Sequence, residues 1–84
     1  MRDSGRASKA AIERVIKDLT DYESVMIEEL ELIMKDVDQL SDIWNDKNYK
    51  LFLASVDNIK SSITSELDTI RYTRHELERK VGMM

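Results

Sequence analysis

The stretch from residue 12 to residue 44, IERVIKDLTDYESVMIEELELIMKDVDQLSDIW, decides the fold of this chain. Apolar side chains recur in it at a spacing of seven, and a second set falls four residues later in each repeat. This heptad pattern keeps one seam of a helix facing a partner helix. The first set is Ile12, Leu19, Met26, Ile33 and Leu40, and the second is Ile16, Leu30, Val37 and Trp44.

One polar residue, Glu23, interrupts this seam. Because burying an unpaired carboxylate is costly, we expect Glu23 either at a frayed edge or paired across the interface with a basic residue. Four further apolar residues flank the seam and widen it to roughly 140° on a helical wheel. We therefore expect the first helix to touch more than one neighbour. The flanking residues are Val15, Tyr22, Ile27 and Met34.

Turn-favouring residues follow Trp44, in the order Asn45, Asp46, Lys47, Asn48. Short polar side chains of this kind hydrogen-bond to nearby backbone amides, and both Asp46 and Asn48 are candidates to cap a following helix. We predict the bend of a hairpin at about residues 44–48.

A second helical pattern then runs to the end of the chain. Its apolar steps of three and four residues predict a helix from about residue 48 to residue 81, with Arg74 in a gap of the stripe. Arg79 and Lys80 favour the negative end of the helix dipole, and Gly82 is a plausible stop. The stripe comprises Tyr49, Phe52, Val56, Ile59, Ile63, Leu67, Ile70, Leu77 and Val81.

These patterns predict one all-α domain, residues 1–84, built as an antiparallel helix-turn-helix hairpin. We expect a flexible tail at residues 1–8, helix one at about 9–43, and helix two at about 48–81. A lone hairpin buries little apolar surface, so we also expect two hairpins to pair into a four-helix bundle. The predicted partner interface comprises Ile12, Ile16, Leu19, Met26, Leu30, Ile33, Val37, Leu40, Phe52, Val56, Ile59, Ile63, Leu67, Ile70 and Leu77.

The composition excludes several classes of protein. Cysteine is absent, which excludes disulfides, and a net charge of −4 disfavours nucleic acid or an anionic membrane as the main partner. No apolar run is long enough to span a bilayer. Residues 1–9 lack the apolar stretch of a signal peptide, so we expect any export to bypass the general secretory route.

An enzymatic role has little support in the sequence. His75 is the only histidine, and it stands among charged residues on a helix, where a solvated side chain is the default. Acidic runs such as 28–31 are typical of solvated helix faces, and no Glu-x-x-His motif suggests a metal centre in a bundle. We predict no catalytic residue, no cofactor and no metal.

Two positions carry a different signal. Trp44 closes the first apolar stripe where the turn begins, a place where a large ring can simply seal the end of the core. Tyr72 lies roughly 140° to 160° away from Ile70 and Leu77 on the helical wheel, so we expect it to point away from its own hairpin. Glu76 follows Tyr72 four residues later, on the same side of the helix.

Together, Trp44 in the central turn and Tyr72-x-x-x-Glu76 near the end resemble the WXG family of small type VII secretion proteins. Members of that family are helical hairpins of about this length, with a Trp-x-Gly turn and a Tyr-x-x-x-Asp/Glu signal. Here the turn reads Trp44, Asn45, Asp46, so aspartate replaces the glycine. Glycine supplies a left-handed backbone without steric cost, and Asp is one of the few residues that tolerate it.

The resemblance implies a secreted substrate that forms a helical dimer, with Tyr72 and Glu76 as an export signal beside the Trp44 turn of its partner. A secretion ATPase reads this feature in the family. A related interpretation is a targeting partner that binds the helical amino-terminal region of an LXG-type toxin. Both imply a cytoplasmic protein that is then secreted or displayed at the surface of a Gram-positive bacterium.

Several alternatives stay open at this point. The apolar stripe serves a homodimer or a heterodimer equally well. A structural coiled-coil or adaptor module, unrelated to secretion, would also explain the heptads and the acidic balance. In that case Trp44 and Tyr72 have packing roles only.

Overall fold

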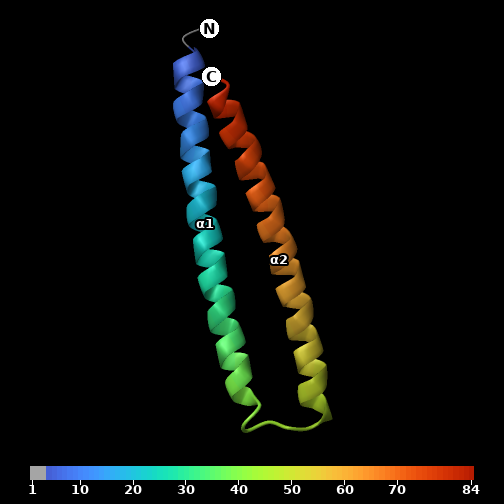
Figure 1. Ribbon diagram of the computed structural model, residues 1–84. Helices are drawn as coiled ribbons and strands as arrows, with labels where there is room; N and C mark the ends of the chain where they lie inside the picture. Colours follow the sequence, from blue (N-terminus) through green and yellow to red (C-terminus); the bar gives the residue numbers. More distant parts are fainter. Residues whose placement is uncertain (1–3) are drawn as a thin grey trace.

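The computed structural model describes the backbone of residues 4–84 and the side chains from residue 8 onward. Two helices, α1 (Ser4–Leu40) and α2 (Lys47–Gly82), make up nearly all of this part of the chain. They run antiparallel, with the start of α1 and the end of α2 at one end of the molecule and the connection at the other (Figure 1). The predicted all-α hairpin is confirmed.

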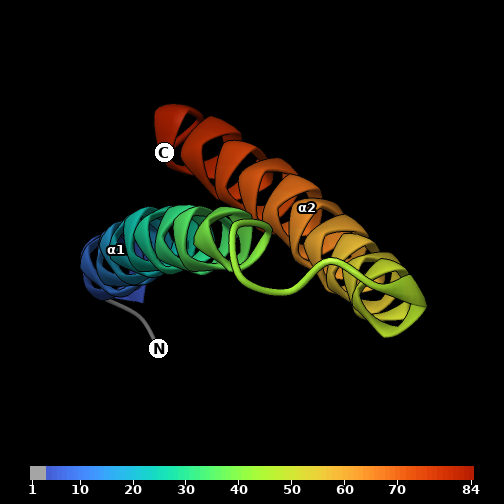
Figure 2. The same cartoon turned by 90° about the horizontal axis from the view of Figure 1, so that it is seen from below.

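The hairpin is long and thin, about as wide as two helices side by side. Its extents are 64 × 18 × 16 Å, and the end-on view shows the two helix axes inclined to each other (Figure 2). Such a shape leaves most side chains near the surface. The buried apolar residues line the contact between the helices and are Val37, Tyr49, Val56, Leu67 and Ile70.

The helix bounds differ from the prediction at both ends of each helix, and α2 ends at Gly82, one residue later than predicted. Helix α1 begins at Ser4, so residues 4–8, predicted as a tail, are helical, because no proline or later glycine interrupts the pattern. Residues 1–3 of the predicted tail lie outside the described residues. At the other end α1 stops at Leu40, three residues before the predicted end.

The early end of α1 follows from local hydrogen bonds. The Ser41 hydroxyl donates to the Asp38 carbonyl at 2.7 Å, and the Ser41 amide donates to the same carbonyl at 3.3 Å. Bonds of this i to i+3 kind tighten the last turn of a helix. The connection therefore spans residues 41–46, and α2 begins one residue earlier than predicted.

Candidate functional site

The connection between the helices is built around Asp46. Its carboxylate accepts a hydrogen bond from the Tyr49 amide at 3.1 Å and caps the first turn of α2. The same oxygen accepts a bond from the Trp44 indole Nε1 at 2.9 Å. The Asp46 side chain thus both caps α2 and binds the Trp44 indole. Of the two candidates for the cap, Asp46 and Asn48, the structure has Asp46.

The backbone of Asp46 is extended, with φ of −137° and ψ of −175°. Residues 4–84 contain no residue with positive φ. The left-handed backbone that a glycine favours is therefore not found at Asp46. Asp46 is accommodated because it acts as a helix cap, for which an extended backbone is usual.

Three aromatic rings close this end of the hairpin. The Trp44 ring lies 5.3 Å from the Tyr49 ring and 5.4 Å from the Phe52 ring, between centroids. The Tyr49 hydroxyl donates to the carbonyl of Val37 at 3.3 Å, which links the start of α2 to the last turns of α1. Trp44 is half-buried and Asn45 is exposed. The sealing role considered for Trp44 is therefore present in the structure.

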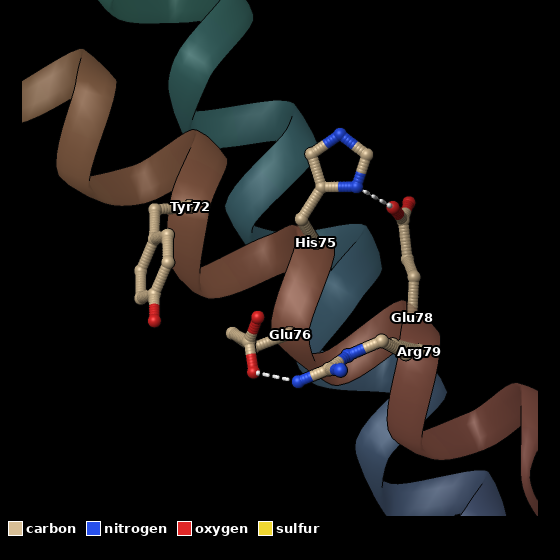
Figure 3. Close-up of a pocket in the computed structure, with 5 residues that line it drawn as sticks. All are labelled: Tyr72, His75, Glu76, Glu78 and Arg79. Atoms are coloured by element: carbon tan, nitrogen blue, oxygen red, sulfur yellow. Dashed lines mark hydrogen bonds and ion pairs between the residues drawn. The ribbon is translucent and has the colours of Figure 1, made fainter.

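The second candidate position lies near the other end of α2. Tyr72 is 68% exposed and points away from α1, as the helical wheel predicts. Figure 3 shows Tyr72 and Glu76 on one side of α2, with His75 and Glu78 on another. An open depression on this surface is lined by Tyr72, His75, Glu76, Glu78 and Arg79.

The charged groups around Tyr72 pair with each other along the helix. Arg79 donates to the Glu76 carboxylate at 2.7 Å, and His75 Nδ1 lies 3.6 Å from a Glu78 oxygen (Figure 3). These side chains are exposed or half-buried, so their pairs contribute little to stability. The phenol ring of Tyr72 stands beside them as an uncovered aromatic surface on a regular helix.

Trp44 and Tyr72 of one chain lie far apart. From Lys47 to Tyr72 the helix rises about 37 Å at about 1.5 Å per residue. The connection that holds Trp44 lies at one end of the hairpin and the carboxyl end of α2 at the other (Figure 1), and Tyr72 is ten residues from that end of α2. A single chain therefore does not bring the turn motif and the Tyr72-x-x-x-Glu76 motif together.

Glu23 lies in the contact between the helices and is only 8% exposed. It accepts hydrogen bonds from the guanidinium groups of Arg71 and Arg74, both on α2. Of the two positions expected for Glu23, a frayed edge or a pair with a basic residue, the structure has the pair. Both basic partners belong to the same chain. The hydrogen bond from Arg71 lowers the pKa of Glu23 below its ordinary value, against the opposing effect of burial.

Sequence reasoning noted Arg74 as a gap in the second stripe but missed Arg71. The spacing of the two arginines could have identified Arg71 as a second partner of Glu23, because residues 71 and 74 are three apart and so lie on adjacent parts of one helix face. Sequence reasoning also missed a second polar contact between the helices, in which the Tyr22 hydroxyl donates a hydrogen bond to the Glu66 carboxylate at 3.3 Å.

The residues predicted as a partner interface divide into three groups. Val37 of α1 and Val56, Leu67 and Ile70 of α2 are buried within the single hairpin, so they form its core. Ile33 and Ile59 are exposed. The others are half-buried, namely Ile12, Ile16, Leu19, Met26, Leu30, Leu40, Phe52, Ile63 and Leu77.

Two other kinds of feature are absent from the described part of the chain. No helix there is long and apolar enough to cross a membrane. No cluster of three or more His, Cys, Asp or Glu side chains there is arranged to hold a metal ion. In comparisons with protein families, with curated proteins and with solved structures, the chain matches none.

Proposed function

We propose that this chain is a small substrate or targeting partner of a type VII secretion apparatus. In this role it forms a helical dimer and presents Tyr72 and Glu76 as an export signal to the secretion ATPase. The observation that carries the proposal is the outward position of Tyr72, an aromatic ring with no share in the hairpin core. Exposed aromatic residues on rigid elements are typical anchors of protein recognition.

The geometry of the hairpin supports the dimer in this proposal. Because about 37 Å of helix lies between the turn and Tyr72 within one chain, a signal that combines both motifs needs a second helical chain. That chain is a similar hairpin or the helical amino-terminal region of an LXG-type toxin. The half-buried and exposed apolar residues along the hairpin provide surface for either partner.

The test is export of Tyr72→Ala from a Gram-positive bacterium with a type VII apparatus. Leu51→Ala is a matched control, because Leu51 is on the same helix and is also 68% exposed. We expect Tyr72→Ala to keep its fold by circular dichroism and to lose export, while Leu51→Ala is exported. Export of Tyr72→Ala at the normal level would refute the proposal.

A second pair of variants tests the acidic half of the signal. Glu76→Gln removes the charge four residues after Tyr72, and Glu78→Gln removes a charge two residues further along the same helix. We expect only the first to reduce export. The rival role as a structural coiled-coil module predicts instead that Tyr72→Ala lowers stability or assembly, with no effect specific to export.

A further inference from the structure

Two apolar side chains of α1 point away from the rest of the hairpin. Val25 is 53% exposed and Leu32 is 54% exposed. At about 100° per residue they lie about 160° and 180° around the helix from Glu23, which faces the arginines of α2. Seven residues separate them, so they stand on nearly one line, about 10 Å apart along the helix axis. Neither side chain contributes to the hairpin core, and neither belongs to the predicted partner interface.

Leu32 stands among carboxylates. It lines an open depression together with Glu28, Glu29, Glu31 and Lys35. None of these charged groups forms an ion pair within the described residues, although Glu31 and Lys35 are four apart. Apolar surface in contact with water and like charges one turn apart are both unfavourable in the free chain. A partner that covers the leucine and neutralises the carboxylates removes both costs.

The negative charge of the whole chain is concentrated in this part of α1. Residues 25–40 contain five acidic residues and one basic residue, a net charge of −4. The full chain has 17 acidic and 13 basic residues, so the other residues contribute 12 of each and are neutral overall. A positively charged partner is therefore attracted to this segment more than to any other part of the hairpin.

We propose that the outer face of α1, defined by Val25, Glu28, Glu29, Leu32 and Asp36, binds a basic amphipathic helix of another protein. Such a helix carries two apolar residues at a spacing of seven, with lysine or arginine beside them. Laid along α1, it sets its apolar pair against the valine and the leucine and its cations against the carboxylates. A polyamine or another small cation would meet the charges but leave both apolar side chains in water.

The outer face and the export signal are separate parts of the molecule. Tyr72 and Glu76 belong to α2, whereas the outer face lies on α1, on the side turned away from α2. The two are therefore tested by different variants and different readouts. A chain that binds basic helices but is exported normally as Tyr72→Ala would lose its proposed function and keep the outer face as a binding surface.

The first experiment uses a synthetic helical peptide of alanine, leucine and lysine, with two leucines seven residues apart and lysines beside them. Two matched peptides are controls, one with glutamate for every lysine and one with serine for both leucines. Isothermal titration of the full chain gives the dissociation constants at low salt. We expect the leucine–lysine peptide to bind about tenfold more tightly than either control, and more weakly as salt is added. Absence of binding, or equal binding of the serine peptide, would overturn the inference.

The second experiment locates the bound peptide with paired variants of the chain. Leu32→Ser removes one apolar anchor, and Leu51→Ser makes the same change at an exposed site of α2. Glu29→Lys reverses a charge within the outer face, and Asp68→Lys reverses one at an exposed site of α2. Circular dichroism verifies that all four variants keep their helices, as expected for exposed sites.

We expect each outer-face variant to weaken binding of the leucine–lysine peptide by about fivefold or more, because each removes part of the contact. Each α2 variant should bind the peptide as the natural chain does. Unchanged binding by Leu32→Ser or Glu29→Lys, or an equal loss in both members of a pair, would overturn the inference.

Discussion

Glu23 of α1 and Arg74 of α2 form an ion pair at 2.5 Å, and each residue interrupts the apolar pattern of its own helix. The two polar gaps therefore meet in the folded hairpin. If one helix slid along the other, the carboxylate and the guanidinium would each face apolar side chains without a partner. Such a pair fixes the register of two helices, as polar residues within apolar seams often do.

The first prediction concerns this pair. Glu23→Ala leaves the Arg71 and Arg74 guanidinium groups without their carboxylate at a partly covered site, and removing one member of such a pair destabilises a protein. We expect the melting temperature to fall by about 5 to 10 °C, measured by circular dichroism. Glu28→Ala, at an exposed site of the same helix, is the control and should change it little.

A double variant separates register from stability. Glu23→Leu combined with Arg74→Leu replaces both polar residues by apolar ones, a change that is often neutral or stabilising. We expect it to recover most of the melting temperature lost in Glu23→Ala. A double variant that melts as low as Glu23→Ala would contradict this account of the pair.

The second prediction is a dependence on pH. The pKa of Glu23 is lowered in the folded chain, mainly by the hydrogen bond from Arg71, so the unfolded chain binds the proton more readily. The stabilisation from this carboxylate is thus fully present above its ordinary value of 4.5 and is lost as the pH falls through the lower, folded value. Urea unfolding at pH 7 and pH 3 should show a larger loss for the natural protein than for Glu23→Gln.

Other carboxylates also titrate in this range, and the comparison with Glu23→Gln removes their contribution. Equal losses of stability in the two proteins between pH 7 and pH 3 would mean that the ion pair adds nothing to folding.

The hairpin itself was predictable from sequence because its signals are repeated many times. Heptad spacing from Ile12 to Leu40 specifies a helix over four repeats, so no single residue decides the outcome. The helix ends were less predictable, because each depends on a few local bonds. The hydroxyl of Ser41 and the carboxylate of Asp46 set the bounds of the turn, and either side chain has other ways to bond.

The candidate site was predictable only in part. The wheel places Tyr72 outside the core because its angle relative to Ile70 and Leu77 depends on helix geometry alone. The cap formed by Asp46 was one of two candidates from the turn sequence, but its bond to the Trp44 indole was not predicted. Comparison with a glycine motif suggested a left-handed backbone, whereas the carboxylate acts by accepting bonds from the Trp44 indole and the Tyr49 amide.

The third prediction follows from those two bonds. Asp46→Ala removes the cap of α2 and the partner of the Trp44 indole, and loss of a capping side chain costs about 1 kcal/mol. Asp46→Asn keeps an oxygen in the same place and should retain most of the stability. Fluorescence of the only tryptophan during urea unfolding measures both variants at the site itself. Equal stability of Asp46→Ala and the natural protein would contradict the capping role.

The fourth prediction distinguishes two tyrosines by the loss of a single hydroxyl. Tyr49 is buried and donates to the Val37 carbonyl, so Tyr49→Phe leaves that carbonyl without this donor and should cost about 1 kcal/mol. Tyr72→Phe changes only an exposed hydroxyl and should stay within about 0.5 kcal/mol of the natural protein. Chemical unfolding measures both, and a larger loss for Tyr72→Phe would contradict the placement of these rings.

The fifth prediction tests whether the narrow core of a single hairpin contributes to its stability. Leu67 is 6% exposed against α1, and truncation of a buried leucine costs about 3 kcal/mol through lost contacts and the cavity left behind. Leu51, on the same helix, projects into solvent, so Leu51→Ala should cost little and gains from the helix propensity of alanine. Urea unfolding of the two variants at equal concentration provides the comparison. If they unfold at the same denaturant concentration, α1 and α2 do not pack against each other in solution as they do here, and the core that positions Tyr72 outward is absent.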